Sequence, residues 1–360
     1  MSQNKLATTK NQHYVPQFYQ RFFSADKDHK TIGAYIIEQR KYIPRAPIKN
    51  QSSGDYFYST NQKIEDALGK IEKLAFAVIQ QIHENPEKKL SKEAKYTLYV
   101  FTIIQIGRTL DRVNFIQESF NELIKSIFKA HIDIEKKHNR IEDAELLTDE
   151  IIDSIVVNLQ EPALHSLGIH AKIISTCIDL KMKILINKTS TSFITSDNPA
   201  CMYNMFFERI GEPSYALGSK GLIIYMPVAK NLAIIYYDPK CYKMGFRKKE
   251  YLEITQKEDI ENLNSLISCS ANKVLYCLDK SISLVELEKY ANKHNNMKPK
   301  KRTKIINGVK QKNSEIVGGY TNSMYCKLRL NFVKELPASK AIKKNYESFK
   351  DTLRPIAYGR

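Results

Sequence analysis

Apolar residues recur at helical spacing through most of the first half of the chain. Residues 61–85 place an apolar side chain at every third or fourth position, and Pro86 ends this pattern. A second pattern begins at Ser91 and predicts one very long helix, unless Gly107 breaks it. Two further helical stretches follow. We therefore expect a layer of long helices over residues 61–188.

The pattern changes to that of β-strands after residue 188. Runs of β-branched and aromatic residues, bounded by Asp, Asn, Gly and Pro, occur between residues 189 and 280 with helical segments among them. Another such run lies within residues 315–335, and residues 31–50 contain one or two short strands. These patterns predict an α+β fold, in which the layer of long helices packs against a mostly antiparallel sheet.

Two regions are expected along the chain. Residues 1–296 form a mixed α/β core domain, with its helical part at about 61–188 and its sheet part at about 189–280. Residues 297–360 then form a basic C-terminal extension with an added strand. Within this extension, residues 298–314 contain several basic residues and no acidic residue, which is typical of a solvated linker.

Composition and charge favour a folded protein with an anionic partner. Hydrophobic residues make up 42% of the chain and charged residues 26%, which is average for a globular protein. The 56 Lys and Arg against 39 Asp and Glu give a net charge of +17, which favours nucleic acid, nucleotides or an anionic lipid surface as partners. The alternative is compositional, because abundant Lys, Asn and Ile are also what an AT-biased genome produces.

The sequence shows no sign of export, membrane insertion or structural metal binding. The first ten residues lack the apolar segment of a secretory signal, and no apolar run reaches the length of a membrane span. The six cysteines are scattered, with neither a CxxC pair nor a Cys–His cluster. We expect a cytoplasmic protein whose oligomeric state is not readable from the sequence.

A series of short motifs runs through most of the chain. They are, in order, NQHYVPQFYQRFF at residues 11–23, then DYFYS, IEDALGKIE, QIGRT, FITSDNPA, YMPVAKNLAI and ENLN. Together they resemble the domain of unknown function family 4238, over roughly residues 11–280. HYVP and TSDNP are the most specific of these motifs. The family has no assigned reaction, so the resemblance implies a shared fold and a shared site.

His13, in the HYVP motif, is the first candidate for chemistry. An imidazole titrates near neutral pH and is the commonest acid–base group in enzymes. Pro16 restricts the chain around it to an extended path. The alternative is packing, because the aromatic residues that follow, from Tyr14 to Phe23, would hold this segment against the core.

Asp197 and Asn198, in FITSDNPA, follow an apolar strand. Polar side chains at the end of a strand are often placed for binding or catalysis, and Asp197 could bind a metal, act as a base or orient His13. The alternative is a turn, because Asp and Asn side chains bind the backbone that follows and proline fixes φ.

Arg108 is the third candidate. Gln105, Arg108 and Arg112 share one face of the predicted helix within an apolar stretch. A buried arginine needs an anion, which Glu72, Asp197 or the phosphate of a ligand could supply. Glu72 has apolar neighbours on its own helix, so an internal ion pair with Arg108 is the more ordinary outcome.

The first functional hypothesis is a cytosolic, nuclease-like enzyme acting on nucleic acid or nucleotide phosphodiesters. Such an enzyme could serve as a toxin or a phage-defence effector. His13, Asp197, Arg108 and Glu72 would be catalytic around one cavity, with Mg²⁺ or Mn²⁺ as a candidate metal. The expected substrate-binding residues are Tyr14, Gln105, Asn198, Arg112, Lys300, Lys301 and Arg302.

The second hypothesis is a non-catalytic module that binds nucleic acid or a partner protein. In that case the same four residues form an internal polar network, and residues 298–314 contact the partner. The two hypotheses differ in whether the four side chains converge on an accessible pocket.

Overall fold

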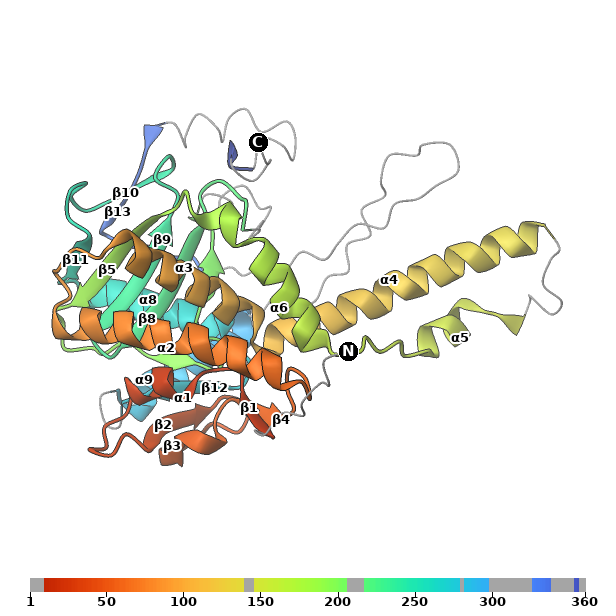
Figure 1. The fold of residues 1–360 in the computed structure, drawn as a ribbon, viewed down its shortest axis with the longest axis horizontal. Coiled ribbons are helices and arrows are strands. Elements are labelled where there is room, and N and C mark those ends of the chain that lie inside the picture. The colour runs from red at the N-terminus through yellow and green to blue at the C-terminus, as the bar shows by residue number, and fades with distance from the viewer. Residues whose placement is uncertain are drawn as a thin grey trace.

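A five-stranded sheet lies at the centre of the protein, and one long helix projects from the body that surrounds it (Figure 1). The computed structural model describes residues 10–138, 146–205, 217–278, 282–297, 326–337 and 353–355. The α-helices are α1 (Gln17–Arg21), α2 (Gln62–Glu84), α3 (Lys92–Gly107), α4 (Leu110–Lys137), α5 (Asp149–Ser154), α6 (Pro162–Lys172), α8 (Lys257–Ser270) and α9 (Leu284–Met297). Two short 3-10 helices are η1 (Ile48–Asn50) and η3 (Ile174–Cys177).

The strands form two larger sheets and two short pairs. The five-stranded sheet has the order β11 (Tyr251–Ile254), β5 (Lys181–Asn187), β9 (Leu232–Tyr237), β8 (Ile223–Ala229) and β7 (Cys201–Tyr203). The four-stranded sheet has the order β3 (Lys41–Pro47), β2 (Thr31–Ile36), β12 (Val274–Cys277) and β6 (Thr195–Ser196). The two pairs are β1 (Asn11–His13) with β4 (Ser53–Asp55), and β10 (Tyr242–Met244) with β13 (Val333–Glu335).

Helices cover both faces of the five-stranded sheet. Along β8, Ile223 and Tyr225 join the core under α8 and α9, whereas Ile224 and Met226 join the core under α2 and α3. Successive strand residues point to opposite faces, so the unbroken apolar run of β8 is buried on both sides. Figure 1 shows α2 and α3 in front of this sheet and α8 behind it. The helices therefore form two layers, one on each face of the sheet, where the sequence predicted a single layer.

The fold is α+β with mostly antiparallel sheets, as the sequence predicts. Among the described strands, the pair β11–β5 is parallel, and every other pair is antiparallel. One boundary is wrong. β5 begins at Lys181, inside the range that was assigned to helices, because its run of apolar residues is buried in a strand that pairs with β9 on one side and β11 on the other.

Gly107 ends the predicted long helix. α3 stops at Gly107 and α4 begins at Leu110, so the second apolar pattern forms two helices instead of one. A Cβ atom at Gly107 would lie 2.5 Å from Cγ of His170, which shows how closely α6 packs against this point.

The described helices include none that is long and apolar enough to cross a membrane.

The aromatic residues of the opening segment pack on the helical layer, as predicted. The ring centroid of Phe18 lies 5.9 Å from that of Phe76 in α2 and 5.6 Å from that of Phe101 in α3. Tyr19 and Phe23 are completely buried. This segment is therefore part of the core.

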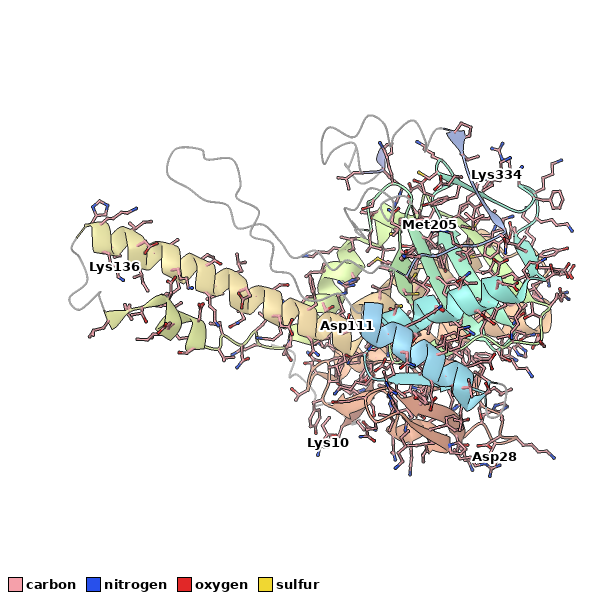
Figure 2. All side chains as sticks on the ribbon, turned by 180° about the vertical axis from the view of Figure 1, so that it is seen from behind. Lys10, Asp28, Asp111, Lys136, Met205 and Lys334 are labelled. Atoms are coloured by element: carbon pink, nitrogen blue, oxygen red, sulfur yellow. The ribbon has the colours of Figure 1, made fainter. Side chains whose placement is uncertain are left out.

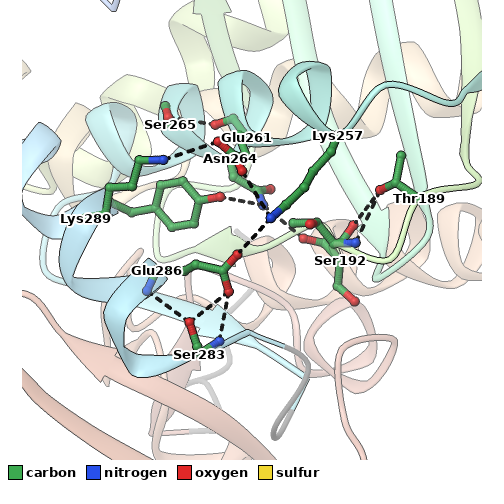
Figure 3. Close-up of polar contacts among 11 residues, drawn as sticks. Thr189, Ser192, Lys257, Glu261, Asn264, Ser265, Ser283, Glu286 and Lys289 are labelled. Carbon is green, nitrogen blue, oxygen red and sulfur yellow. Dashed lines mark hydrogen bonds and ion pairs between the residues drawn. The ribbon is translucent and has the colours of Figure 1, made fainter.

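Polar contacts fix α9 and the segment before β6 onto α8 (Figure 3). Nζ of Lys257 and Nζ of Lys289 lie 3.4 and 3.2 Å from carboxylate oxygens of Glu261. The Asn264 amide, fully buried, donates to the carbonyl of Ser192 at 2.9 Å. The exposed ion pairs contribute little, whereas the buried amide ties a loop to the helix.

The described parts of residues 297–360 pack on the body. β13 supplies the expected added strand by pairing with β10, and the side chains of Leu328 and Arg354 are buried. The structure therefore does not support a basic extension that stands apart from the core. Lys300, Lys301 and Arg302 lie outside the described residues.

Candidate functional site

Arg108 is the centre of a buried polar network at the end of α3. Its Nε donates to the hydroxyl of Tyr58 at 2.8 Å, and its Nη2 donates to Glu72 Oε1 and to the backbone carbonyl of His13, each at 2.7 Å. The Arg108 side chain is only 2% exposed. The network therefore joins α3 to α2, to β1 and to the segment after β4.

Internal partners satisfy the Arg108 guanidinium. Glu72 supplies the counter-ion that a buried charge requires, which is the ion pair expected from the sequence. Burial raises the pKa of the Tyr58 hydroxyl far above its ordinary value, although Arg108 lowers it, so this hydroxyl stays protonated. It donates to the carbonyl of His13 at 3.0 Å.

His13 enters this network through its backbone. Its imidazole Nε2 lies 3.2 Å from the carbonyl oxygen of Lys49, on the outer side of β1. Burial lowers the pKa of His13, although the hydrogen bond to the Lys49 carbonyl raises it. The ring is therefore neutral at pH 7, and the contact with Arg108 is made by the His13 carbonyl.

The neighbouring residues hold the same backbone segment. The side-chain amide of Gln105 donates to the carbonyl of Tyr14 at 2.8 Å. The amide of Gln12 donates to the carbonyl of Ser59 at 2.9 Å and accepts from the N–H of Tyr58 at 2.8 Å. The motifs HYVP, DYFYS and QIGRT thus meet in one clamp that fixes the opening segment.

Asp197 and Asn198 hold a turn between α8 and β12. The carboxylate of Asp197 accepts from the N–H of Asn272 at 2.8 Å and from that of Lys273 at 2.7 Å. Asn198 donates to the carbonyl of Ser270 at 2.9 Å. Burial raises the pKa of Asp197 to about 6, although these backbone hydrogen bonds lower it. These contacts tie the motif to a distant turn, and they are not the bonds to its own following backbone that the local-turn alternative predicts.

The structure brings together three of the four candidate catalytic residues. Arg108 contacts Glu72 and the His13 carbonyl, whereas the recorded hydrogen bonds of the Asp197 carboxylate go to the α8–β12 turn. Arg112 lies over the ring of Phe115 at 5.3 Å, and its Nε has no hydrogen-bond partner among the described residues. The described residues also contain no cluster of three or more His, Cys, Asp or Glu placed to hold a metal.

The open pocket near this network is a shallow feature of one helix. It is lined by one side of α2, through Gln62, Glu65, Asp66, Gly69, Lys70 and Lys73. Its lining has mixed charge and includes neither Arg108 nor His13. It is therefore not a cavity around the predicted catalytic groups.

A second candidate lies beside the beginning of α3, at the other end of this helix from Arg108. It consists of residues 245–251, which we call the basic loop. Gly245 adopts φ +57°, and a Cβ there would lie 2.8 Å from Cδ1 of Leu252, so the turn requires glycine. Phe246 follows with 76% of its surface exposed. Residues 247–249, Arg-Lys-Lys, are exposed as well. An apolar ring and three cations therefore face solvent together.

A buried lysine holds the backbone of the basic loop. Nζ of Lys183, in β5, donates to the carbonyl of Phe246 at 2.7 Å and to the carbonyl of Lys249. Burial lowers the pKa of Lys183. The backbone of the loop is thus held by Lys183, while the side chains of Phe246, Arg247 and Lys248 are exposed to solvent and Lys249 Nζ lies 5.1 Å from the centre of the Tyr251 ring.

Further basic residues surround the loop. Lys243 and Lys334 are direct partners across the strand pair β10–β13, and both are exposed. Like charges in such a pair are unfavourable, and an anion bound between them would remove the penalty. Glu250 connects the loop to α3 through an ion pair of 2.5 Å with Lys95. The turn and first residues leading into α3 add the exposed side chains of Lys88, Lys89 and Lys92.

Sequence reasoning did not identify the basic loop. Its signal is the aromatic residue directly before three basic residues in GFRKKEY. The support by Lys183 and the neighbouring Lys334 depend on contacts 63 and more residues apart, which no local pattern reveals.

In a comparison with known protein families, one family model matches the part of the chain that contains these features. The family model described as "Protein of unknown function (DUF4238)" matches residues 11–281. The match covers the Arg108 network, the turn at Asp197 and the basic loop. No curated protein and no solved structure matches the chain.

Proposed function

The chain belongs to the DUF4238 family, and we propose that it is a non-catalytic protein that binds single-stranded nucleic acid through its basic loop. The observation that carries the proposal is the exposed ring of Phe246 directly beside Arg247 and two lysines, on a backbone held by Lys183. The net charge of +17 supports a polyanion as the partner.

The chemistry of the loop suits a single strand. The Arg and Lys side chains neutralise backbone phosphates and release bound counter-ions, so affinity must fall as salt rises. An exposed aromatic ring stacks on a base only where the base is unpaired, which favours single strands over a duplex. Lys243 and Lys334 extend the positive surface beside Phe246 and so continue the path for the backbone.

Internal contacts favour the non-catalytic version of the proposal. Arg108, Glu72 and Asp197 are each engaged by other parts of the fold, and His13 contributes its carbonyl to the Arg108 network. Nuclease activity, a requirement for Mg²⁺ or Mn²⁺, and a role as a toxin or phage-defence effector remain predictions from the sequence. None of them is needed to explain the contacts of these four residues.

Two substitutions in the loop test this proposal. We expect Phe246→Ala to weaken binding of a fluorescent single-stranded oligonucleotide about tenfold, because the ring no longer stacks on a base. Arg247→Glu should weaken binding by at least the same factor and reduce the dependence of affinity on salt, because a phosphate contact becomes a repulsion. Fluorescence anisotropy at several salt concentrations measures both effects.

Matched controls separate the loop from general effects. Val285→Ala removes an apolar side chain that is also 76% exposed, and Arg45→Glu makes the same change in net charge at a site 75% exposed. Both should bind nearly as the wild type does. Equal affinity of Phe246→Ala, Arg247→Glu and the wild type would refute the loop as the interface. Strand cleavage with Mg²⁺ or Mn²⁺ that is lost in His13→Ala would refute the non-catalytic reading.

A further inference from the structure

Helix α4 extends away from the rest of the protein. In Figure 2 it runs from Asp111, beside the body, to Lys136 at its far end. Of its 28 residues, only Val113 and Ile132 are buried. A helix of this length spans about 42 Å, and most of it has no contact with the sheets. Its stability as a projecting arm therefore depends on whatever packs along its sides.

The segment that includes α5 packs along one side of α4. Lys129 Nζ lies 2.9 Å from Asp153, and Asn121 accepts a hydrogen bond from the N–H of Val157 at 2.8 Å. Lys125 donates to the carbonyl of Asp153 at 2.6 Å. These contacts define the side of α4 that is already covered.

A row of apolar residues, which we call the α4 stripe, follows a different side of the helix. It consists of Ile116, Phe120, Leu123, Ile127, Ala130 and Ile134. The spacing alternates between four and three residues, which is the repeat of a coiled coil. Leu123, Ile127 and Ile134 are exposed, with Ile127 at 54%. Such a row is unfavourable in water unless another surface covers it.

The α4 stripe points away from α5. At about 100° per residue, the centre of the stripe lies roughly 170° around the helix from the side formed by Asn121, Lys125 and Lys129. The segment that covers one side of α4 therefore does not cover the stripe. The exposed fractions of Leu123, Ile127 and Ile134 agree with this geometry.

We propose that the α4 stripe binds the same stripe of a second copy of this chain, with the two helices antiparallel. A strict repeat of 3.5 residues packs best against another helix with that repeat, and a second copy supplies one by symmetry. In the antiparallel register, Leu123 packs beside the partner's Ile127, and Ile116 packs beside the partner's Ile134. The contact is then the same on both copies.

Charge along the stripe is compatible with self-association. The residues that flank its central part, Ile124 and Ser126, carry no charge. In the antiparallel register Ile124 meets the partner's Ile124, and Ser126 meets the partner's Ser126. No like charges face one another across the central contact, so two identical helices can approach without electrostatic penalty.

The antiparallel arrangement also separates the positively charged bodies. Each chain carries +17, yet α4 itself contains equal numbers of acidic and basic residues. Antiparallel helices place the two bodies at opposite ends of a contact about 27 Å long, beyond the screening length of ~8 Å at physiological salt. A parallel pair would place the two bodies side by side. The basic loops, near Lys334 at the side of the body away from α4, stay accessible in the dimer (Figure 2).

The short contact predicts a reversible dimer. About three heptads of one helix bury less than the ~800 Å² per partner of a standard interface. We therefore expect a dissociation constant in the micromolar range, so that monomer and dimer coexist at the protein concentrations used in solution experiments. Sedimentation of the full chain should show a mass that rises from 41.6 kDa towards twice this value as concentration increases.

One pair of substitutions tests the proposal. Ile127→Lys places a charge in the centre of the stripe and should keep the protein monomeric at concentrations where the wild type is dimeric. Ile169→Lys, at a site 49% exposed on α6, makes the same chemical change outside the stripe and should leave the dimer intact. Circular dichroism confirms that both variants keep the wild-type helix content.

Cross-linking tests the orientation. The native cysteines in the structure are buried, so new surface cysteines can be oxidised selectively. A mixture of Ile116→Cys and Ile134→Cys chains should form a mixed disulfide dimer, whereas Ile134→Cys alone should not. A wild type that stays at 41.6 kDa at all concentrations would overturn the proposal. So would an undiminished dimer in Ile127→Lys, or efficient cross-linking of Ile134→Cys with itself.

Discussion

Replacing Arg108 by alanine is expected to lower the free energy of unfolding by about 3 kcal/mol. The substitution removes the donors to Tyr58, Glu72 and the His13 carbonyl at once, and it leaves the Glu72 carboxylate without its counter-ion. Glu72 is partly exposed and can regain some hydration, which places the expected loss at the lower end for a buried pair. Urea denaturation followed by circular dichroism measures the change.

Two further variants make this result specific. Arg108→Lys keeps the charge but cannot reach all three acceptors. Its free energy of unfolding should therefore lie between that of the wild type and that of Arg108→Ala. Arg45→Ala breaks an exposed pair with Asp26, 3.7 Å long, and should change stability by less than ~1 kcal/mol. If Arg108→Ala were as stable as Arg45→Ala, the network would not hold the opening segment, and Arg108 would again be a candidate for ligand binding.

Replacing Arg354 by alanine is expected to lower the free energy of unfolding by a similar amount. Its guanidinium donates to Asp179 at 2.8 Å, to the carbonyls of Ser219 and Leu217 at 2.7 Å, and to the carbonyl of Thr176 at 2.5 Å. All of these bonds are lost together, and the carbonyls of Ser219 and Leu217 are left as buried acceptors. We expect a loss of about 3 kcal/mol, measured by the same denaturation experiment.

The control for Arg354 is a cation from the same part of the chain that does not enter the core. Lys334 is exposed on β13, so Lys334→Ala should unfold at nearly the wild-type urea concentration. A loss below ~1 kcal/mol in Arg354→Ala would contradict its role in attaching the C-terminal segment to the body.

The period of the apolar pattern was sufficient to predict the main elements. Helical spacing located α2, α3 and α4, and Gly107 was the expected point at which the long pattern could break. β5 was missed because a seven-residue strand with a continuous apolar run has no period that distinguishes it from the end of a helix. The helices on both faces of the sheet could not be predicted, because strand order is set by contacts that are distant in sequence.

The candidate site was predicted in part. The pairing of Arg108 with Glu72 followed from two residues that each needed a partner on an apolar face. The carboxylate of Asp197 binds the turn at residues 272–273, and this partner was not visible in the sequence because it lies 75 residues away. The motifs of the family resemblance are found mainly in contacts that hold the fold, which leaves the surface residues of the basic loop without a motif of their own.

The location of the nucleic-acid interface is the central claim, and one measurement tests it most directly. Hydrogen–deuterium exchange of the full chain, with and without a single-stranded oligonucleotide, reports which backbone amides the partner protects. We predict new protection at residues 243–251 and around residues 88–92, with none at residues 11–15 or 195–198. Protection confined to residues 11–15 and 195–198 would contradict the account and return the site to His13 and Asp197.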